Sequence, residues 1–177
     1  MRRIVIGSAV SIPALLLLAG CTGGSSARVA SASSPIVSAA PLVLSAAAYV
    51  AAAASIDYYE IQSAELALER AQDPNNRAFA QKTLTAHQGT SAQLSMAGRR
   101  LNLLPTASLT PEHQAMLDAL KATSDFDNTY RAQQAILLKE GITLHGSFAK
   151  AGQSPTLRPV AGNAEQVMRQ NQSELRR

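Results

Sequence analysis

Between Ala48 and Leu104 the hydrophobic and polar positions repeat with the period of an α-helix and are interrupted once. The break is Asp73-Pro74-Asn75-Asn76, where the residue before proline is disfavoured in the α region. Either Asp73 or Asn75 can cap the helix that follows. Two helices joined by so short a turn pack as antiparallel neighbours. At about 100° per residue, the inward face of the first helix is expected to carry Ala53, Asp57, Glu60, Ala64, Ala67 and Ala71.

The second helix has its own inward face and is expected to end at Leu104-Pro105. That face carries Thr83, His87, Thr90, Leu94 and Leu101. Glu60 and His87 are therefore both predicted to point into the bundle. A buried carboxylate and imidazole are costly unless they pair with each other, with a metal or with water. We expect a hydrogen-bonded Glu60–His87 pair, and this constellation is the main candidate for chemistry.

Three further helices are predicted after Pro105. Thr110-Pro111 starts a short helix, with Thr as N-cap and Pro at the first position, and His113 is expected to be solvated in its first turn. A long helix begins after Ser124 or Asp125, with His145 packed at the edge of its apolar stripe, and a last helix begins near Pro155 or Thr156. The fold class predicted is all-α, a four-helix bundle over residues 44–177 with one short extra helix.

The first residues have the form of a bacterial lipoprotein signal peptide. Arg2 and Arg3 precede an apolar stretch that is too short for a spanning helix, and Leu18-Ala19-Gly20-Cys21 follows it. This ending resembles the lipobox, which implies lipidation of Cys21 after removal of residues 1–20. The alternative is an ordinary secreted protein. Thr22 in the position after the cysteine implies the outer membrane, facing the periplasm.

Residues 21–43 are rich in Ser, Ala and Gly and are predicted to be a flexible linker, because such a composition cannot bury a core. Ile36 to Ile56 is uncharged and long enough to suggest a membrane span, but Pro41 interrupts it and much of it is Ala and Ser. We therefore favour a helix that starts near Leu42–Ser45.

Composition excludes several classes of function. The formal charge of +4 includes Arg2 and Arg3, which leave with a signal peptide, so it is weak evidence for an anionic partner. Aromatic residues make up 4% of the chain and are not interleaved with basic ones, which argues against nucleic-acid binding. The lone cysteine permits no internal disulfide. There is no phosphate-binding glycine loop and no catalytic triad pattern, so no enzyme activity is predicted.

The chain from Tyr49 to about Asn171 resembles the domain-of-unknown-function 4142 family, which implies a ferritin-like helical bundle of the bacterial envelope. The resemblance covers most of the chain after Cys21. The matching residues are Glu60-Ile61, Glu65 to Ala71, Arg77 to Ala80, His87, Leu103 to Pro105, His113, Phe126 to Tyr130 and the break before Pro155.

The chain departs from the family pattern at its polar positions. Ala86 stands where the family typically has Asp, and Leu138 stands where it has His. In the last helix, Met168, Gln170 and Asn171 occupy the region of a further His. A di-iron bundle needs several carboxylates and paired Glu-x-x-His motifs, so Glu60 and His87 look like the remnant of a larger site.

Three functions remain open on this sequence. The first is a lipid-anchored, non-catalytic envelope bundle without a cofactor, attached to the membrane through Cys21. The second is a metal-binding or redox protein that holds iron, manganese or zinc with Glu60 and His87, helped by His145 or Asp57. The third is a binder of anionic surfaces or envelope polymers. The sequence names no protein partner and no oligomeric state.

Overall fold

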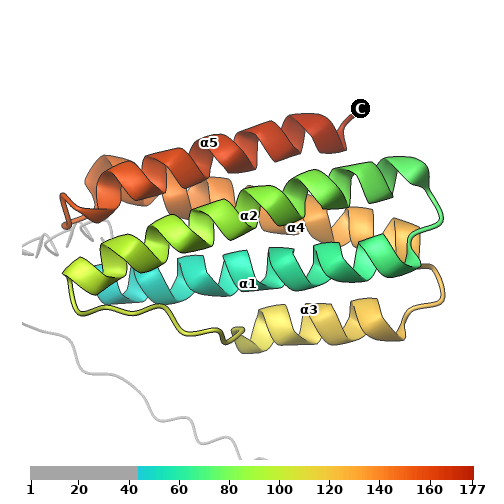
Figure 1. Cartoon of the computed structure of the whole chain (residues 1–177), viewed down its shortest axis with the longest axis horizontal. Coiled ribbons are helices and arrows are strands. Elements are labelled where there is room, and N and C mark those ends of the chain that lie inside the picture. The colour runs from blue at the N-terminus through green and yellow to red at the C-terminus, as the bar shows by residue number, and fades with distance from the viewer. Residues whose placement is uncertain (1–43) are drawn as a thin grey trace, which may run out of the picture. The chain divides into compact units, whose positions relative to one another are not determined.

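In a computed structural model, residues 44–177 form five α-helices, and no strand occurs among them (Figure 1). They are α1 (Ala46–Arg70), α2 (Pro74–Arg100), α3 (Pro111–Ala122), α4 (Phe126–Ala151) and α5 (Leu157–Leu175). The prediction of an all-α bundle is confirmed. The predicted signal peptide, Cys21 and the linker at 21–43 lie outside the described residues. Within residues 44–177, no helix is both long and apolar enough to cross a membrane.

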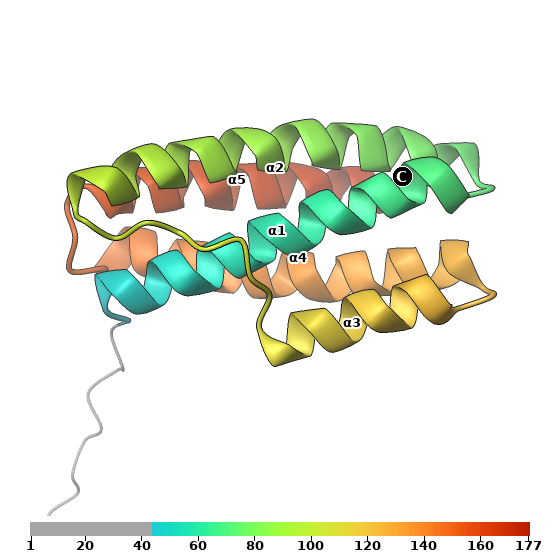
Figure 2. The same ribbon diagram turned by 60° about the horizontal axis from the view of Figure 1, so that its bottom comes forward.

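The four long helices surround one core, and each is antiparallel to its two neighbours. α1 packs against α2 and α4, and α5 packs against α2 and α4 (Figure 1). Residues 101–125 lead from the end of α2 to the start of α4 at the opposite end of the bundle. They include α3, which lies on the outside beside α1 and α4 (Figure 2). The molecule is therefore two helical hairpins joined by one long crossover.

Local side chains explain where most helices begin. The Ser45 side chain accepts a hydrogen bond from the Ala48 N–H at 3.2 Å, which starts α1 inside the predicted range. Of the two predicted caps for α2, Asp73 is the one used, and it accepts from the Asn75 N–H at 2.8 Å. Thr110 caps α3 as predicted. Asp125 stands at the N-cap of α4 but makes no side-chain hydrogen bond to a backbone N–H there.

The second helix is shorter than predicted, because α2 ends at Arg100 and not at Leu104-Pro105. The N–H groups of Leu101 and Leu103 both donate to the Gly98 carbonyl, and Asn102 adopts a left-handed conformation with φ of 54°. Asn tolerates this conformation better than most residues. The chain turns so tightly that a Cβ at Gly98 would overlap the Leu103 carbonyl oxygen. The termination signal is therefore Gly98 with Asn102, which lie seven and three residues before Pro105.

The predicted inward faces are buried except at Leu101, which is half-buried and follows the end of α2, and the apolar residues form two clusters along the bundle. One cluster lies where α1 begins, and its centre is Tyr49 stacked on Phe148 at a ring-centroid distance of 3.9 Å. The larger cluster continues toward the other end and includes residues of α3. We call the end formed by the starts of α1 and α5 and the ends of α2 and α4 the N-terminal end of the bundle.

Arg70, the last residue of α1, is half-buried. Its guanidinium donates to the carbonyl oxygens of Leu120, Lys121 and Thr123 and lies 4.7 Å from the Phe126 ring centroid. These carbonyls belong to the end of α3, where the last carbonyl groups lack helical partners. Arg70 thus fastens the crossover to α1.

Candidate functional site

Asp57 of α1 is held by two residues of α2 in the interior of the bundle. Its Oδ1 accepts a hydrogen bond from the Thr90 hydroxyl at 2.7 Å and lies 2.8 Å from His87 Nδ1. The three side chains lie on the inward faces predicted for their helices. A carboxylate beside His Nδ1 fixes the ring orientation and leaves Nε2 directed elsewhere. The partner of His87 is therefore Asp57, and the prediction of a direct Glu60–His87 hydrogen bond is wrong.

Glu60 is fully buried one turn after Asp57, yet neither of its carboxylate oxygens has a hydrogen-bond partner among the described residues. Burial raises the pKa of Glu60, and the nearby His87 and the Gln134 amide oppose that rise. The Gln134 amide nitrogen donates to Ser63 Oγ at 3.2 Å, and no bond of ordinary geometry reaches Glu60. The structure thus holds Glu60 in conditions that favour its neutral, protonated form.

The pKa of His87 is also raised, although burial opposes this shift. Burial disfavours its charged form, but the hydrogen bond to Asp57 and the charges of Glu60 and Asp57 outweigh burial and raise the pKa of His87. The hydrogen bond to Asp57 is the largest of the causes that raise this pKa. His87 Nε2 is buried and has no partner within residues 44–177.

Further unpartnered polar atoms come from all four long helices. Such buried groups are uncommon in folded proteins and call for an explanation in each case. Two hydrogen bonds, Lys82–Glu174 and Gln93–Asn163, join α2 to α5 and show how these antiparallel helices are aligned. In this alignment Asn171 lies opposite residues 83–87. We call the residues that carry these unpartnered atoms, together with Asp57, the polar centre. The unpartnered atoms are Glu60 Oε1 and Oε2, Thr83 Oγ1, His87 Nε2, Tyr130 Oη, Gln134 Oε1 and Asn171 Nδ2.

The polar centre fits a metal ion only in part. His87 presents a free Nε2 while Asp57 holds its Nδ1, which is the usual arrangement of a metal-bound histidine. Glu60 supplies a free carboxylate, and Gln134 supplies an amide oxygen. However, no group of three or more His, Cys, Asp or Glu residues in 44–177 is placed to hold a metal. Two charged or imidazole ligands with an amide oxygen make a weaker site than the usual three or four.

His145 is buried, as predicted for a packed histidine, and its Nδ1 lies 3.0 Å from the Tyr49 hydroxyl. Burial is the main cause that lowers the pKa of His145 to about 4. The ring is therefore neutral near pH 7 and accepts a hydrogen bond from Tyr49. Among residues 44–177, the hydrogen bond of the His145 ring goes to Tyr49, and His145 forms no metal-binding group with Glu60 and His87.

The prediction that His113 is solvated is wrong, because only 3% of its surface is exposed. Its Nδ1 lies 2.7 Å from Ser55 Oγ and its Nε2 lies 3.2 Å from Glu140 Oε2. Ser55 also accepts from the Thr110 N–H at 2.9 Å. The first turn of α3 faces α1 and α4, so its histidine joins three elements. Ser55 is itself buried, which makes the trio a structural tie and not a nucleophilic site.

Four members of the polar centre were not predicted as site residues: Thr83, Tyr130, Gln134 and Asn171. A sequence signal existed for Gln134, which falls four residues after Tyr130 and three before Leu137 on the apolar stripe of the long helix. Asn171 likewise follows Met168 by three residues. A polar residue in phase with buried ones indicates an inward polar group, which the apolar pattern alone overlooks.

No curated protein and no solved structure matches the chain. A family model does match, over residues 31–177, and this range includes all five helices and every member of the polar centre. The chain therefore belongs to the family described as domain of unknown function (DUF4142).

Proposed function

We propose that this protein is a lipid-anchored member of the bacterial cell envelope, at the outer membrane facing the periplasm, with a binding or structural role and no catalytic one. The anchor rests on Cys21, the lone cysteine, at the end of Leu18-Ala19-Gly20-Cys21. The observation that supports a non-catalytic role is burial. Glu60 is 0% exposed and His87 is 1% exposed, so a substrate has no access to the main titratable side chains of the interior.

The anchor is tested by labelling cells with a radioactive fatty acid and separating their membranes. The full chain should carry label and sediment with the outer membrane. Cys21→Ser should lose both the label and the membrane association, because the thioether that holds diacylglycerol cannot form. Thr22→Ser is the matched control and should behave like the wild type. Label that persists in Cys21→Ser, or a wild type without label, would contradict the proposal.

A ferritin-like metal site is the second candidate, and two observations favour it. The two hairpins are joined by a single long crossover, which is also the connection of ferritin-like bundles. In addition, the unpartnered His87 Nε2 and Glu60 carboxylate lie within one buried polar centre. Iron, manganese or zinc could satisfy both groups, with Asp57 orienting the imidazole. Buried water is the competing occupant, since it commonly fills such polar interiors.

Elemental mass spectrometry of the purified protein separates these occupants. It requires purification without chelators and without a histidine tag. A metal site predicts about one metal ion per chain in the wild type, a loss of metal in His87→Ala, and normal content in the control His145→Gln. A metal-free wild type that unfolds cooperatively would leave water as the occupant. Equal metal in wild type and His87→Ala would place the metal elsewhere.

A further inference from the structure

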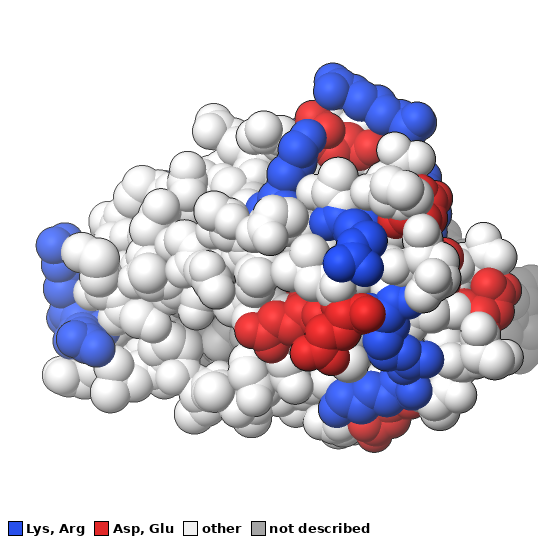
Figure 3. All heavy atoms as spheres, turned by 45° about the vertical axis from the view of Figure 1, so that its right-hand side comes forward, with Lys and Arg blue, Asp and Glu red and all other residues white. Residues whose placement is uncertain are grey.

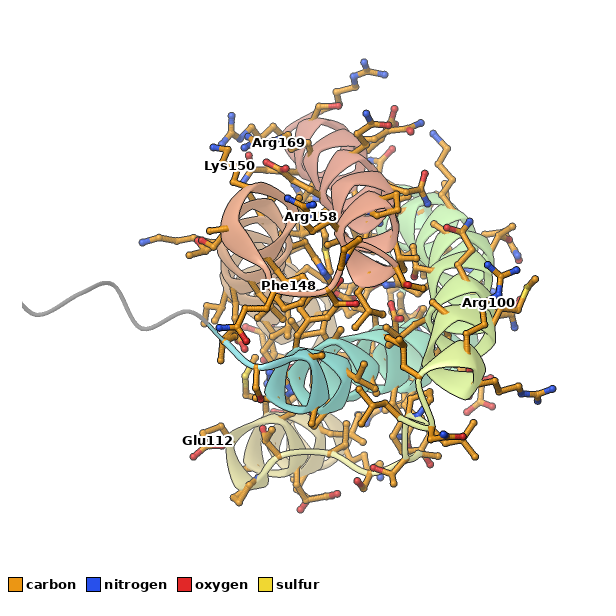
Figure 4. All side chains as sticks on the ribbon, turned by 90° about the vertical axis from the view of Figure 1, so that its left-hand side faces the viewer. Arg100, Glu112, Phe148, Lys150, Arg158 and Arg169 are labelled. Atoms are coloured by element: carbon orange, nitrogen blue, oxygen red, sulfur yellow. The ribbon has the colours of Figure 1, made fainter. Side chains whose placement is uncertain are left out.

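Four exposed cations lie at the N-terminal end of the bundle and have no partner within the described residues. Arg99 and Arg100 end α2, Lys150 lies in the last turn of α4, and Arg158 lies in the first turn of α5. None of them makes an ion pair or a side-chain hydrogen bond inside residues 44–177. Figure 4 looks onto this end and shows Arg158 near its middle, with Lys150 and Arg100 on opposite sides.

Acidic residues are few at the same end, where Glu165 lies beside Gly146 of α4 and pairs with Arg169. The bundle is built there mainly from residues 44–54, 90–108 and 145–164, and all 12 Asp and Glu residues of the chain lie outside these ranges. Figure 3 shows the contrast, with the visible acidic side chains gathered toward the opposite end among other cations. There Lys82 is paired with Glu174. The charge of the bundle is thus segregated along its length.

Helix dipoles explain only part of this segregation. Arg99, Arg100 and Lys150 lie at the ends of their helices, where a cation is favoured. Arg158 lies at the start of α5, where the positive end of the dipole disfavours a cation. An external anionic surface would account for all four positions.

The same end also exposes large apolar side chains. Among the described residues four large hydrophobic side chains are exposed, and three of them, Leu44, Met96 and Leu104, belong to this end. Leu104 also borders a small groove of about 160 Å³, lined by residues of the first turns of α1 and by 103–106. Protruding apolar side chains among cations are typical of proteins that rest on a membrane interface.

We propose that the N-terminal end of the bundle docks on the surface of an anionic phospholipid bilayer, with Arg99, Arg100, Lys150 and Arg158 on headgroup phosphates and Met96 and Leu104 inserted among them. The chain enters the bundle at Leu44, so the segment that carries Cys21 joins it at this same end. The docking surface is a property of the folded bundle. It therefore does not depend on whether Cys21 is acylated, and the two proposals fail separately.

The test uses the chain from residue 21 onward with Cys21→Ser, after cooperative thermal unfolding has confirmed that it is folded. Sedimentation should show binding to phosphatidylglycerol vesicles and little binding to phosphatidylcholine vesicles. Binding to phosphatidylglycerol should weaken as salt is raised from 50 to 500 mM. The triple variant Arg99→Gln, Arg100→Gln and Arg158→Gln should bind more weakly by about fivefold per cation removed. Leu104→Ser should also weaken binding.

The matched control removes cations elsewhere on the bundle. Lys139 and Arg176 are exposed and unpaired within the described residues, and they lie outside the N-terminal end. Lys139→Gln with Arg176→Gln lowers the net charge by two, as does Arg99→Gln with Arg100→Gln. If docking uses the N-terminal end, only the second pair weakens binding substantially. Equal losses in both pairs would overturn the proposal.

A fluorescent probe distinguishes a bilayer from any other source of phosphate. In the Cys21→Ser chain, Met96→Cys creates the only thiol, and Ala78→Cys creates one near the opposite end of α2. An environment-sensitive dye on residue 96 should shift to shorter wavelengths with phosphatidylglycerol vesicles and should not shift with free polyphosphate. The dye on residue 78 should not respond. No shift at residue 96, or an equal shift at both sites, would overturn the proposal.

Discussion

Two carboxylates one turn apart in α1 have opposite surroundings. Asp57 lies within hydrogen-bond distance of His87 and Thr90, whereas Glu60 has no hydrogen-bond partner among the described residues. A buried carboxylate with charge-assisted bonds contributes to stability, and one without them is best kept protonated. Sequence periodicity placed both residues on the inward face but could not distinguish between them. Their different roles follow from which α2 side chain lies opposite each.

Amide substitutions should separate the two carboxylates. Burial raises the pKa of Glu60 and favours its neutral form, so replacement by the neutral isostere in Glu60→Gln should change the free energy of unfolding by less than about 1 kcal/mol. Asp57→Asn removes the negative charge that partners His87 and Thr90, and should cost about 2–4 kcal/mol. Urea unfolding at pH 7 measures both. Similar losses in the two variants would mean that Glu60 is ionised in the folded protein.

His145 should make the fold sensitive to acid. Its pKa is lowered to about 4 mainly by burial, whereas the same side chain has a pKa near 6.5 in the unfolded protein. Between these values the unfolded state binds more protons, so the stabilising contribution of neutral His145 is present above pH 6.5 and is lost as pH falls toward 4. The full loss is about 3 kcal/mol. Denaturation at several pH values should show it.

The variant His145→Gln provides the comparison, since its amide oxygen can still accept from the Tyr49 hydroxyl. As the pH falls from 6.5 to 4, the free energy of unfolding should decrease more in the wild type than in the variant. The raised pKa of Glu60 acts in both proteins and cancels in this difference. A constant difference across that range would show that His145 does not resist protonation.

At the scale of elements, the turn between α1 and α2 is held by a residue of α4. Asp127 accepts hydrogen bonds from the backbone N–H groups of Gln72 and Asp73, at 2.9 and 3.3 Å, and from the Asn76 side chain at 2.7 Å. The Asn76 bond is the main cause that lowers the pKa of Asp127. The two hairpins are therefore joined at this end by a side chain as well as by the crossover.

Removing this tie should loosen the hairpin. Asp127→Ala leaves three donors without their acceptor at a surface turn, and we expect a loss of about 1–2 kcal/mol in the free energy of unfolding. Asp125→Ala is the control, because the Asp125 carboxylate contacts only the Asn128 side chain. Hydrogen exchange should also speed up at Gln72 and Asp73 in the first variant alone. Unchanged exchange there would exclude the proposed role of Asp127.

The number and order of the helices follow from sequence, and so do most of their starts. Ser45, Asp73 and Thr110 act on backbone N–H groups two or three residues away, so their effects are visible in the sequence. The sequence prediction ended α2 too late, because it relied on Pro105 as the end signal and not on Gly98 and Asn102. The inward turn of His113 was missed because α3 is short, and its orientation depends on Arg70 and Glu140 from other helices.

At the scale of the whole molecule, burial and charge are arranged along one axis. The polar centre occupies the interior, four unpaired cations lie at the N-terminal end, and the acidic residues lie mainly outside that end. A domain tethered from its N-terminal end is oriented by such an arrangement. The proposed lipid anchor would hold the basic end near the headgroups. Membrane contact through the anchor would raise the effective concentration of the docking surface at the bilayer, and docking would do the same for the anchor.

The sequence by itself determined the five helices, the inward faces and the family, because helical periodicity and caps act over a few residues. It also places Glu60 and His87 in the interior. Only the tertiary structure decided that Asp57 is the partner of His87, that the Tyr49 hydroxyl lies on His145 Nδ1, and that Tyr130, Gln134 and Asn171 carry unpartnered polar atoms in the interior. Those choices depend on the register and rotation of helices far apart in the chain. Packing of the whole core sets both, because a rotation or shift of one helix would exchange the partners of every buried polar group.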